Sequence, residues 1–176
     1  MKKLPAWAIL TIIAMAAGLL LSVTNSVTLP IIQAGALAEA QATRAGLFPE
    51  AEQFEAVELT EDSGLDNCYQ ALRGGEVAGH VAQITVNGFG GPIEIMLGMD
   101  LNGAITGVSV GGADFKETAG LGARTKEPDF TKQFTGAATP VELGTDVDAV
   151  TGATISSKAV ADGVNAIAEY ITSLEK

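Results

Sequence analysis

Hydroxyl side chains gather near the C-terminus, where residues 148–157 read DAVTGATISS and lead from an extended segment into a helix. Gly152 and Ala153 leave little side chain around Thr154, so its hydroxyl is open to a bulky reagent or a modifying enzyme. A helix start offers unpaired backbone N–H groups and the positive end of the helix dipole, and both favour an anion. The pattern therefore fits a phosphate diester formed on Thr154.

The same residues also fit an ordinary helix start. Ser156 or Ser157 would then cap the helix by accepting a backbone N–H, and Gly152 would serve the turn before it. The two interpretations are compatible, since a capped helix start is also an anion site. The segment that follows predicts an amphipathic helix, because apolar residues recur on one face at alternating spacings of four and three: Val160, Val164, Ile167, Ile171 and Leu174.

A second cluster lies in a loop that reads ETAGLG over residues 117–122. Its glycines, Gly120 and Gly122, let the backbone approach a flat ring, and Leu121 supplies an apolar surface. Thr118 can hydrogen-bond the polar edge of such a ring. Taken alone, the loop is more typical of a glycine-rich surface segment than of a ring-binding site.

Cys68 is the only cysteine and His80 the only histidine. An internal disulfide, a Cys-x-x-Cys-His haem attachment and a set of iron–sulfur ligands are therefore excluded. We expect no metal site and no Ser-His-Asp triad, and we predict that His80 is an ordinary surface or strand histidine. Redox chemistry in this chain would require an organic cofactor.

Residues 4–23 carry no charge, and the next charged residue is Glu39. A helix of about 20 such residues crosses a hydrocarbon layer of about 30 Å. A cleaved signal peptide is the alternative, since Ala36-Leu37-Ala38 resembles a cleavage site, but signal peptides have apolar cores of only about 7–15 residues close to the cut. We predict a retained transmembrane helix within residues 1–25 and a stalk or linker helix over residues 26–46.

The flanking charges predict the orientation of this helix. Lys2 and Lys3 precede the span, and no basic residue follows it until Arg44. By the positive-inside rule, the N-terminus is cytoplasmic, and residues 47–176 form an extracytoplasmic domain held in the cell (inner) membrane by a single pass. The chain has 21 acidic against 10 basic residues. This balance argues against nucleic acid as a partner and against a domain that lies flat on anionic lipid.

Two β-hairpins are predicted from their turn residues. Gly74-Gly75 joins one pair of strands, and Asn102-Gly103 joins the other. The four strands are expected over residues 68–73, 76–86, 93–100 and 104–110.

The remaining segments of the domain are less regular. We predict a short helix over residues 51–54, an acidic loop over 58–67, a long functional loop over 111–134 and a short strand over 141–143. The predicted fold class is α+β. A single N-terminal transmembrane helix is followed by one domain, in which a mostly antiparallel sheet packs against the C-terminal helix.

The clusters follow one another in a recognisable order. Residues 88–92 form a Gly-aromatic-Gly-Gly-Pro turn, residues 117–122 follow the pattern Glu-Thr-x-Gly-Leu-Gly, and residues 148–156 follow Asp-x-x-Thr-Gly-Ala-Thr-x-Ser. In this order they resemble the covalent FMN-binding domain family, from roughly Leu47 to the C-terminus. That domain occurs in the G subunit of the Rnf electron-transport complex and in the C subunit of the sodium-translocating NADH:quinone oxidoreductase. The length of this chain favours the first, since the second usually carries insertions that are missing here.

The resemblance implies that Thr154 carries FMN through a phosphoester, because the family is flavinylated on the threonine of Gly-Ala-Thr. A separate flavin transferase that uses FAD would form this bond. The resemblance implies no general acid, base or nucleophile in the chain, since the redox chemistry belongs to the cofactor. The other implied FMN-binding residues are Glu117, Thr118, Gly120, Leu121, Gly122, Thr151, Gly152, Ala153 and Ser156.

The function implied is that of an electron carrier, a redox subunit that is not catalytic on its own. It would belong to a membrane-bound ferredoxin:NAD oxidoreductase that translocates Na⁺ or H⁺, and its partners would be the other subunits of that complex. Two alternatives stay open. A stand-alone membrane-anchored flavoprotein that relays electrons to an extracellular acceptor would share every motif, and a non-redox module would leave Thr154 unmodified.

Overall fold

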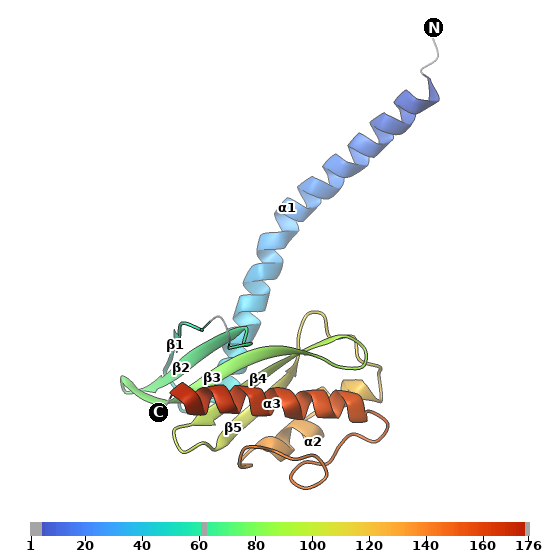
Figure 1. Cartoon of the computed structure of the whole chain (residues 1–176). Coiled ribbons are helices and arrows are strands. Elements are labelled where there is room, and N and C mark those ends of the chain that lie inside the picture. The colour runs from blue at the N-terminus through green and yellow to red at the C-terminus, as the bar shows by residue number, and fades with distance from the viewer. Residues whose placement is uncertain (1–4, 61–62, 175–176) are drawn as a thin grey trace. The chain divides into compact units, whose positions relative to one another are not determined.

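The computed structural model describes residues 5–60 and 63–174, which form two compact units, one up to Ala42 and one from Thr43 onward. Helix α1 (Ala6–Leu47) forms the first unit as far as Ala42, and its last residues belong to the second unit (Figure 1). Its large apolar side chains between Trp7 and Leu37 are exposed, and it is the one helix among the described residues that is long and apolar enough to cross a membrane. The predicted membrane helix and stalk are thus one continuous helix. Lys2 and Lys3, on which the predicted orientation depends, lie outside the described residues.

The second unit is built on an antiparallel sheet whose strands lie side by side in chain order (Figure 1). Because every neighbouring pair is antiparallel, short turns are sufficient to connect consecutive strands. Both predicted hairpins are confirmed, one across Gly74-Gly75 and one across Asn102-Gly103. The strands are β1 (Gln53–Ala56), β2 (Asn67–Arg73), β3 (Glu76–Asn87), β4 (Pro92–Asp100) and β5 (Ile105–Gly111).

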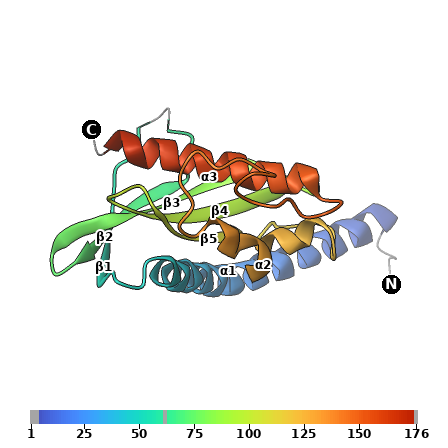
Figure 2. The ribbon, with the colours of Figure 1, turned by 90° about the horizontal axis from the view of Figure 1, so that it is seen from below.

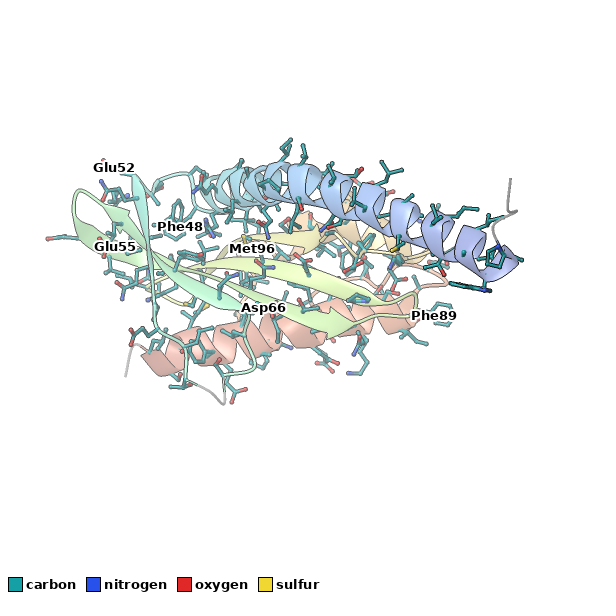
Figure 3. All side chains as sticks on the ribbon, turned by 90° about the horizontal axis from the view of Figure 1, so that it is seen from above. Phe48, Glu52, Glu55, Asp66, Phe89 and Met96 are labelled. Carbon is teal, nitrogen blue, oxygen red and sulfur yellow. The ribbon has the colours of Figure 1, made fainter. Side chains whose placement is uncertain are left out.

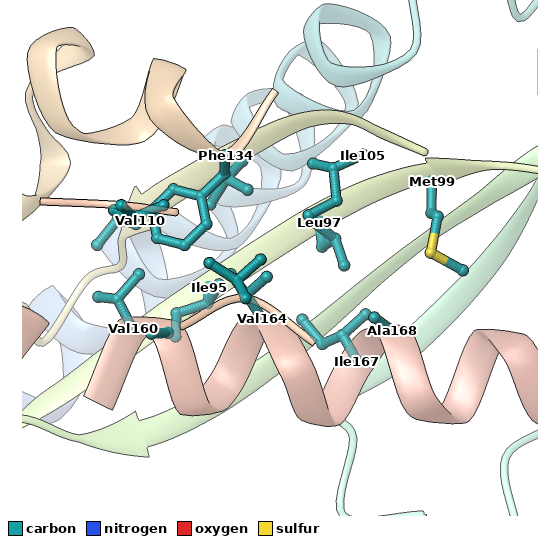
Figure 4. Close-up of a cluster of buried hydrophobic side chains, with 14 of the residues drawn as sticks. Ile95, Leu97, Met99, Ile105, Val110, Phe134, Val160, Val164, Ile167 and Ala168 are labelled. Carbon is teal, nitrogen blue, oxygen red and sulfur yellow. The ribbon is translucent and has the colours of Figure 1, made fainter. Parts of the chain in front are cut away.

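Helix α3 (Thr154–Leu174) runs along one face of this sheet (Figure 2). Alternate residues of β4, such as Ile95 and Leu97, point into the core between the sheet and the helix, where they meet Val164 and Ile167 (Figure 4). The predicted apolar face of α3 is confirmed for its first four members, which are fully buried: Val160, Val164, Ile167 and Ile171.

Leu174 is the exception on that face, because it is 40% exposed in the last described turn of the helix. The predicted apolar face is therefore buried only as far as Ile171. The α+β class itself, with a long apolar N-terminal helix, an antiparallel sheet and a packed C-terminal helix, is confirmed.

The last turn of α1 belongs to the second unit. The Thr106 Oγ1 hydroxyl donates a hydrogen bond of 2.7 Å to the carbonyl oxygen of Leu47. A Cβ added to Gly107 would stand 3.0 Å from Leu47 Cδ2, and one added to Gly79 would overlap the ring of Phe48 (Figure 3). Small residues on the strands therefore make room for the end of the helix.

Three local predictions are wrong. Residues 51–54 are not helical, because Gln53–Ala56 pairs with β2 and gains a sheet ladder that an isolated helical turn cannot match. The segment 111–134 is not a loop throughout: it contains η1 (Gly122–Lys126), α2 (Pro128–Thr131) and η2 (Lys132–Phe134). These turns form because they bury Phe130 and Phe134.

The predicted strand at residues 141–143 is wrong as well. Only an isolated parallel bridge joins Leu143 to Val147. Asn165 of α3 instead holds the segment, because its side chain accepts from Val141 N and donates to Val141 O. These two bonds satisfy the backbone that a neighbouring strand would otherwise have paired.

Candidate functional site

Three segments that are distant in the sequence meet around one cavity at the N-terminal end of α3. Its volume is about 410 Å³, within the range of small-molecule pockets. The turn between β3 and β4, the loop before η1 and the first turn of α3 each contribute to its walls. The lining residues are Phe89, Glu117, Thr118, Leu121, Gly122, Gly152, Ala153, Thr154, Ile155 and Ser156.

Thr154 is the first residue of α3 and is exposed on the rim of the cavity. The chain reaches it through a tight turn, in which Ala153 N donates to Val150 O at 2.9 Å and Gly152 adopts φ +78°. A left-handed φ of this kind favours glycine, which explains the residue at that step. Thr154 is the first residue of this 21-residue helix. Its hydroxyl therefore lies at the positive, N-terminal end of the helix dipole.

The prediction that Ser156 or Ser157 caps α3 is wrong, because both lie inside its first turn. Ser157 Oγ instead accepts a hydrogen bond of 3.0 Å from the backbone N–H of Val150. Ser156 Oγ donates one of 2.9 Å to Oε2 of Glu117. Each hydroxyl therefore fastens a loop to the start of the helix.

Glu117 is only 9% exposed, and its carboxylate lies where the three segments join. Its Oε1 accepts from the backbone N–H of Gly90 at 2.9 Å, and its Oε2 accepts from Ser156. The residue thus connects the β3–β4 turn to α3 through its own loop.

Apolar side chains stand exposed around the mouth of the cavity. Phe89 is 72% exposed, Ile155 59% and Leu121 43%. Figure 3 shows Phe89 at the tip of the β3–β4 hairpin, at the opposite end of the sheet from Glu52 and Glu55. Such a group of exposed apolar residues marks a surface that binds a ligand or a partner.

The structure brings most of the predicted site residues together in this cavity, and it leaves two outside its lining. Gly120 shapes the loop with φ +76° without lining the cavity. Thr151 lines a smaller neighbouring pocket together with Arg124 and Asp148. Sequence reasoning did not assign Phe89 or Ile155 to the site. The Gly-aromatic-Gly-Gly-Pro turn was a usable signal for Phe89, whereas nothing in the local pattern distinguishes Ile155.

Neither Cys68 nor His80 lines this cavity. Burial raises the pKa of the Cys68 thiol from its ordinary 9.0 to about 11, so the thiol is protonated and inert near neutral pH. His80 lies in β3 as predicted, but it is 4% exposed and so is no surface histidine. Within residues 5–60 and 63–174, no cluster of three or more histidine, cysteine or acidic side chains could hold a metal ion.

Known proteins resemble this chain in sequence and in fold. Residues 88–169 match the FMN-binding domain. The G subunit of the Na⁺-translocating ferredoxin:NAD⁺ oxidoreductase complex of Acetobacterium woodii is 30% identical over 96% of this chain and 91% of that protein. The G subunit of the ion-translocating oxidoreductase complex of Methanosarcina acetivorans is 32% identical over 94% of this chain and 93% of that protein. The crystal structure of Shewanella oneidensis NqrC has a TM-score of 0.51 at 17% identity, covers 72% of this chain and 74% of that one, and supports the fold alone.

The fold and the cavity thus define an FMN-binding domain that follows a long apolar helix in the sequence. The chain belongs to the family of G subunits of ion-translocating oxidoreductase complexes. The family resemblance seen in the sequence motifs is confirmed.

Proposed function

We propose that this protein is the electron-carrier subunit of an Rnf-type membrane complex that couples electron flow between ferredoxin and NAD to the translocation of Na⁺ or H⁺. It carries electrons through an FMN joined by a phosphoester to Thr154. The observation that carries this proposal is the exposed Thr154 hydroxyl at the positive end of α3, on the rim of a cavity lined by the family's motif residues.

The residues around the cavity fit such a cofactor. Its phosphate belongs at the helix start, where unpaired N–H groups and the helix dipole favour an anion. Leu121 and Phe89 offer apolar surface for the isoalloxazine ring, and Thr118 offers a hydroxyl for its polar edge. FMN, when bound, supplies the transfer of single electrons, and the protein binds it, orients it and sets its potential.

The wider setting of the protein is part of the same proposal. Helix α1 anchors the chain in the cell membrane by a single pass, with the N-terminus in the cytoplasm and the FMN-binding domain on the extracytoplasmic side. The other subunits of the complex donate and accept its electrons. A separate flavin transferase attaches the FMN to Thr154.

Peptide mapping of the protein from its native membrane tests the covalent bond. Trypsin cuts after Lys132 and Lys158, so Thr154 lies in the peptide 133–158. We expect this peptide to carry the mass of FMN less one water, fragmentation to locate the modification on Thr154, and the intact protein to fluoresce in a denaturing gel. A peptide recovered wholly unmodified from native membranes contradicts the proposal.

A second measurement distinguishes the membrane-complex component from the stand-alone flavoprotein. We expect an affinity-tagged chain, solubilised in mild detergent, to co-purify with integral membrane subunits in fixed ratio. Isolation of the flavinylated protein without any such subunit would favour the stand-alone carrier.

A further inference from the structure

We propose that Glu117 is a positioning residue with two roles. Its carboxylate fastens the Phe89 turn to the first turn of α3, and its negative charge lowers the reduction potential of the flavin at Thr154. The second role rests on the proposed FMN, whereas the first is a property of the chain alone.

The fastening role follows from the contacts of the two carboxylate oxygens. Oε1 accepts the Gly90 N–H at 2.9 Å, and Oε2 accepts the Ser156 hydroxyl at 2.9 Å. Gly90 follows Phe89 in the β3–β4 turn, and Ser156 lies two residues after Thr154. One side chain therefore links the turn that carries Phe89, an apolar wall of the cavity, to the helix turn that carries the proposed attachment residue.

Two glycines make the space that this carboxylate occupies. A Cβ added to Gly88 would overlap Oε1 of Glu117, and a Cβ added to Gly122 would overlap Oε2. These two positions belong to different segments, one before and one after Glu117 in the sequence. The two glycines therefore leave room for the carboxylate of Glu117, in addition to any role in forming their own turns.

The charge of Glu117 is not cancelled by its neighbours. Both oxygens act as acceptors, which is the pattern of an ionised carboxylate. Its two donors are neutral, and no lysine or arginine in the described part of the chain forms an ion pair with it. Because Glu117 lines the same cavity as Thr154, its field opposes the arrival of electrons on a flavin held there.

Asp100 offers a matched control for both roles. Its carboxylate also holds a turn, because Oδ1 accepts from the backbone N–H groups of Asn102 and Ala104 at 2.9 and 2.8 Å. It ends β4, whereas the Phe89 turn precedes the start of β4 at Pro92. Asp100→Asn thus removes one turn-holding charge at the far end of the same strand.

The charge is tested by redox titration of the flavinylated full chain in detergent. Gln keeps the shape of Glu and an acceptor oxygen for Gly90, and the Ser156 hydroxyl can accept from its NH2 group, so Glu117→Gln removes the charge and keeps both contacts. At a fixed ambient potential, we expect the variant to raise the ratio of reduced to oxidised flavin about tenfold or more, the size of a unit charge several ångströms away at an effective dielectric constant of about 20. Asp100→Asn leaves the ratio unchanged. A Glu117→Gln ratio equal to that of the wild type overturns the electrostatic role.

The fastening role is tested without flavin, by hydrogen exchange of the Gly90 amide in the unflavinylated full chain. Protection is expected to persist in Glu117→Gln and Asp100→Asn and to fall at least tenfold in Glu117→Ala. If Glu117→Ala does not fold, Ser156→Ala provides the test, since freeing Oε2 from α3 also loosens the Gly90 contact. Unchanged protection overturns the fastening role.

Absence of flavin from the wild-type protein would overturn the proposed function and the electrostatic role with it, while the exchange data still decide the fastening role.

Discussion

Leu121 lies directly against Gly152: a Cβ built on that glycine would stand 3.0 Å from Leu121 Cδ2. The two residues come from different walls of the cavity, one from the loop before η1 and one from the turn before α3. Their contact forms part of the cavity wall that also contains Thr154, and it makes the turn sensitive to a single added methyl group.

Gly152→Ala is therefore expected to impair flavin attachment and stability together. Its left-handed φ of +78° and the crowding against Leu121 both oppose a side chain. Gly144→Ala is the matched control, because its φ is +84° and nothing lies within 4 Å of an added Cβ. Both variants should lose about 1–2 kcal/mol of unfolding free energy from backbone strain, measured by denaturant titration. Only Gly152→Ala should also reduce in-gel flavin fluorescence, and equal fluorescence in the two variants would contradict the role of the contact.

Thr154→Ala should abolish flavin fluorescence of the protein band while leaving the fold intact, because an exposed hydroxyl is not needed for packing. Thr145→Ala, which changes another exposed threonine of the same tryptic peptide, should retain full fluorescence. In-gel fluorescence with circular dichroism of both variants makes the comparison. A fluorescent Thr154→Ala band would place the bond on another residue.

Leu121→Glu should keep the covalent bond and lower the potential of the flavin, since a negative charge beside the ring disfavours its reduced anionic form. Leu101→Glu introduces the same charge at a residue of similar exposure, 49% against 43%, in the turn after β4. Both variants change the net charge equally, so a difference between their flavin potentials in redox titration reports the local effect of the charge at residue 121. Equal potentials would remove Leu121 from the ring pocket.

Cys68 is expected to make the unfolding free energy fall at alkaline pH. Its pKa is raised from 9.0 to about 11 by burial, so the folded state binds the thiol proton more tightly than the unfolded state does. That stabilisation is complete below about pH 9 and is lost as the pH rises through about 11. The unfolding free energy of the wild type should therefore fall more steeply over this interval than that of Cys68→Ala. Parallel pH profiles of the two proteins would show that the thiol ionises freely.

The core under α3 predicts a contrast between two leucine-sized residues of one helix. Ile167 is fully buried, whereas Leu174 is 40% exposed. Ile167→Ala should cost about 2–5 kcal/mol of unfolding free energy, as expected for a large-to-small change in a packed core. Leu174→Ala should cost less than about 1 kcal/mol, because much of that side chain meets solvent. Similar losses in denaturant titration would show that the end of α3 is packed in solution.

The local features of this fold could be predicted from the sequence, because their causes are local. Gly74-Gly75 and Asn102-Gly103 set the two hairpins, and the four-and-three spacing of Val160, Val164 and Ile167 sets the helix. Strand β1 could not be predicted in this way. Its few residues carry no strand pattern of their own, and only the backbone of β2 makes them a strand.

The motifs predicted residues that lie together in the structure, but not the hydrogen bonds that connect them. Thr154, Leu121 and Gly152 were predicted because their types and spacing suit a phosphate and a ring, and all three line one cavity. The bond between Ser156 and Glu117 joins residues 39 positions apart, and no period or turn rule reports such a pair. The alternative in which Ser156 or Ser157 caps α3 is wrong because the helix begins at Thr154 and both serines lie inside its first turn. There Ser156 bonds the distant Glu117, and Ser157 bonds the nearby Val150.

The wide mouth of the cavity, with Phe89 72% exposed, is a poor shape for retaining a small molecule by affinity alone. The proposed bond through Thr154 would remove the dissociation equilibrium, so no enclosing lid would be required and neither oxidation state could dissociate preferentially. Electron tunnelling weakens steeply with distance, and an uncovered rim lets a second redox centre come close to the ring edge. If the ester forms as proposed, it would retain the flavin in a cavity that stays open, and the open mouth would let a redox partner approach the ring.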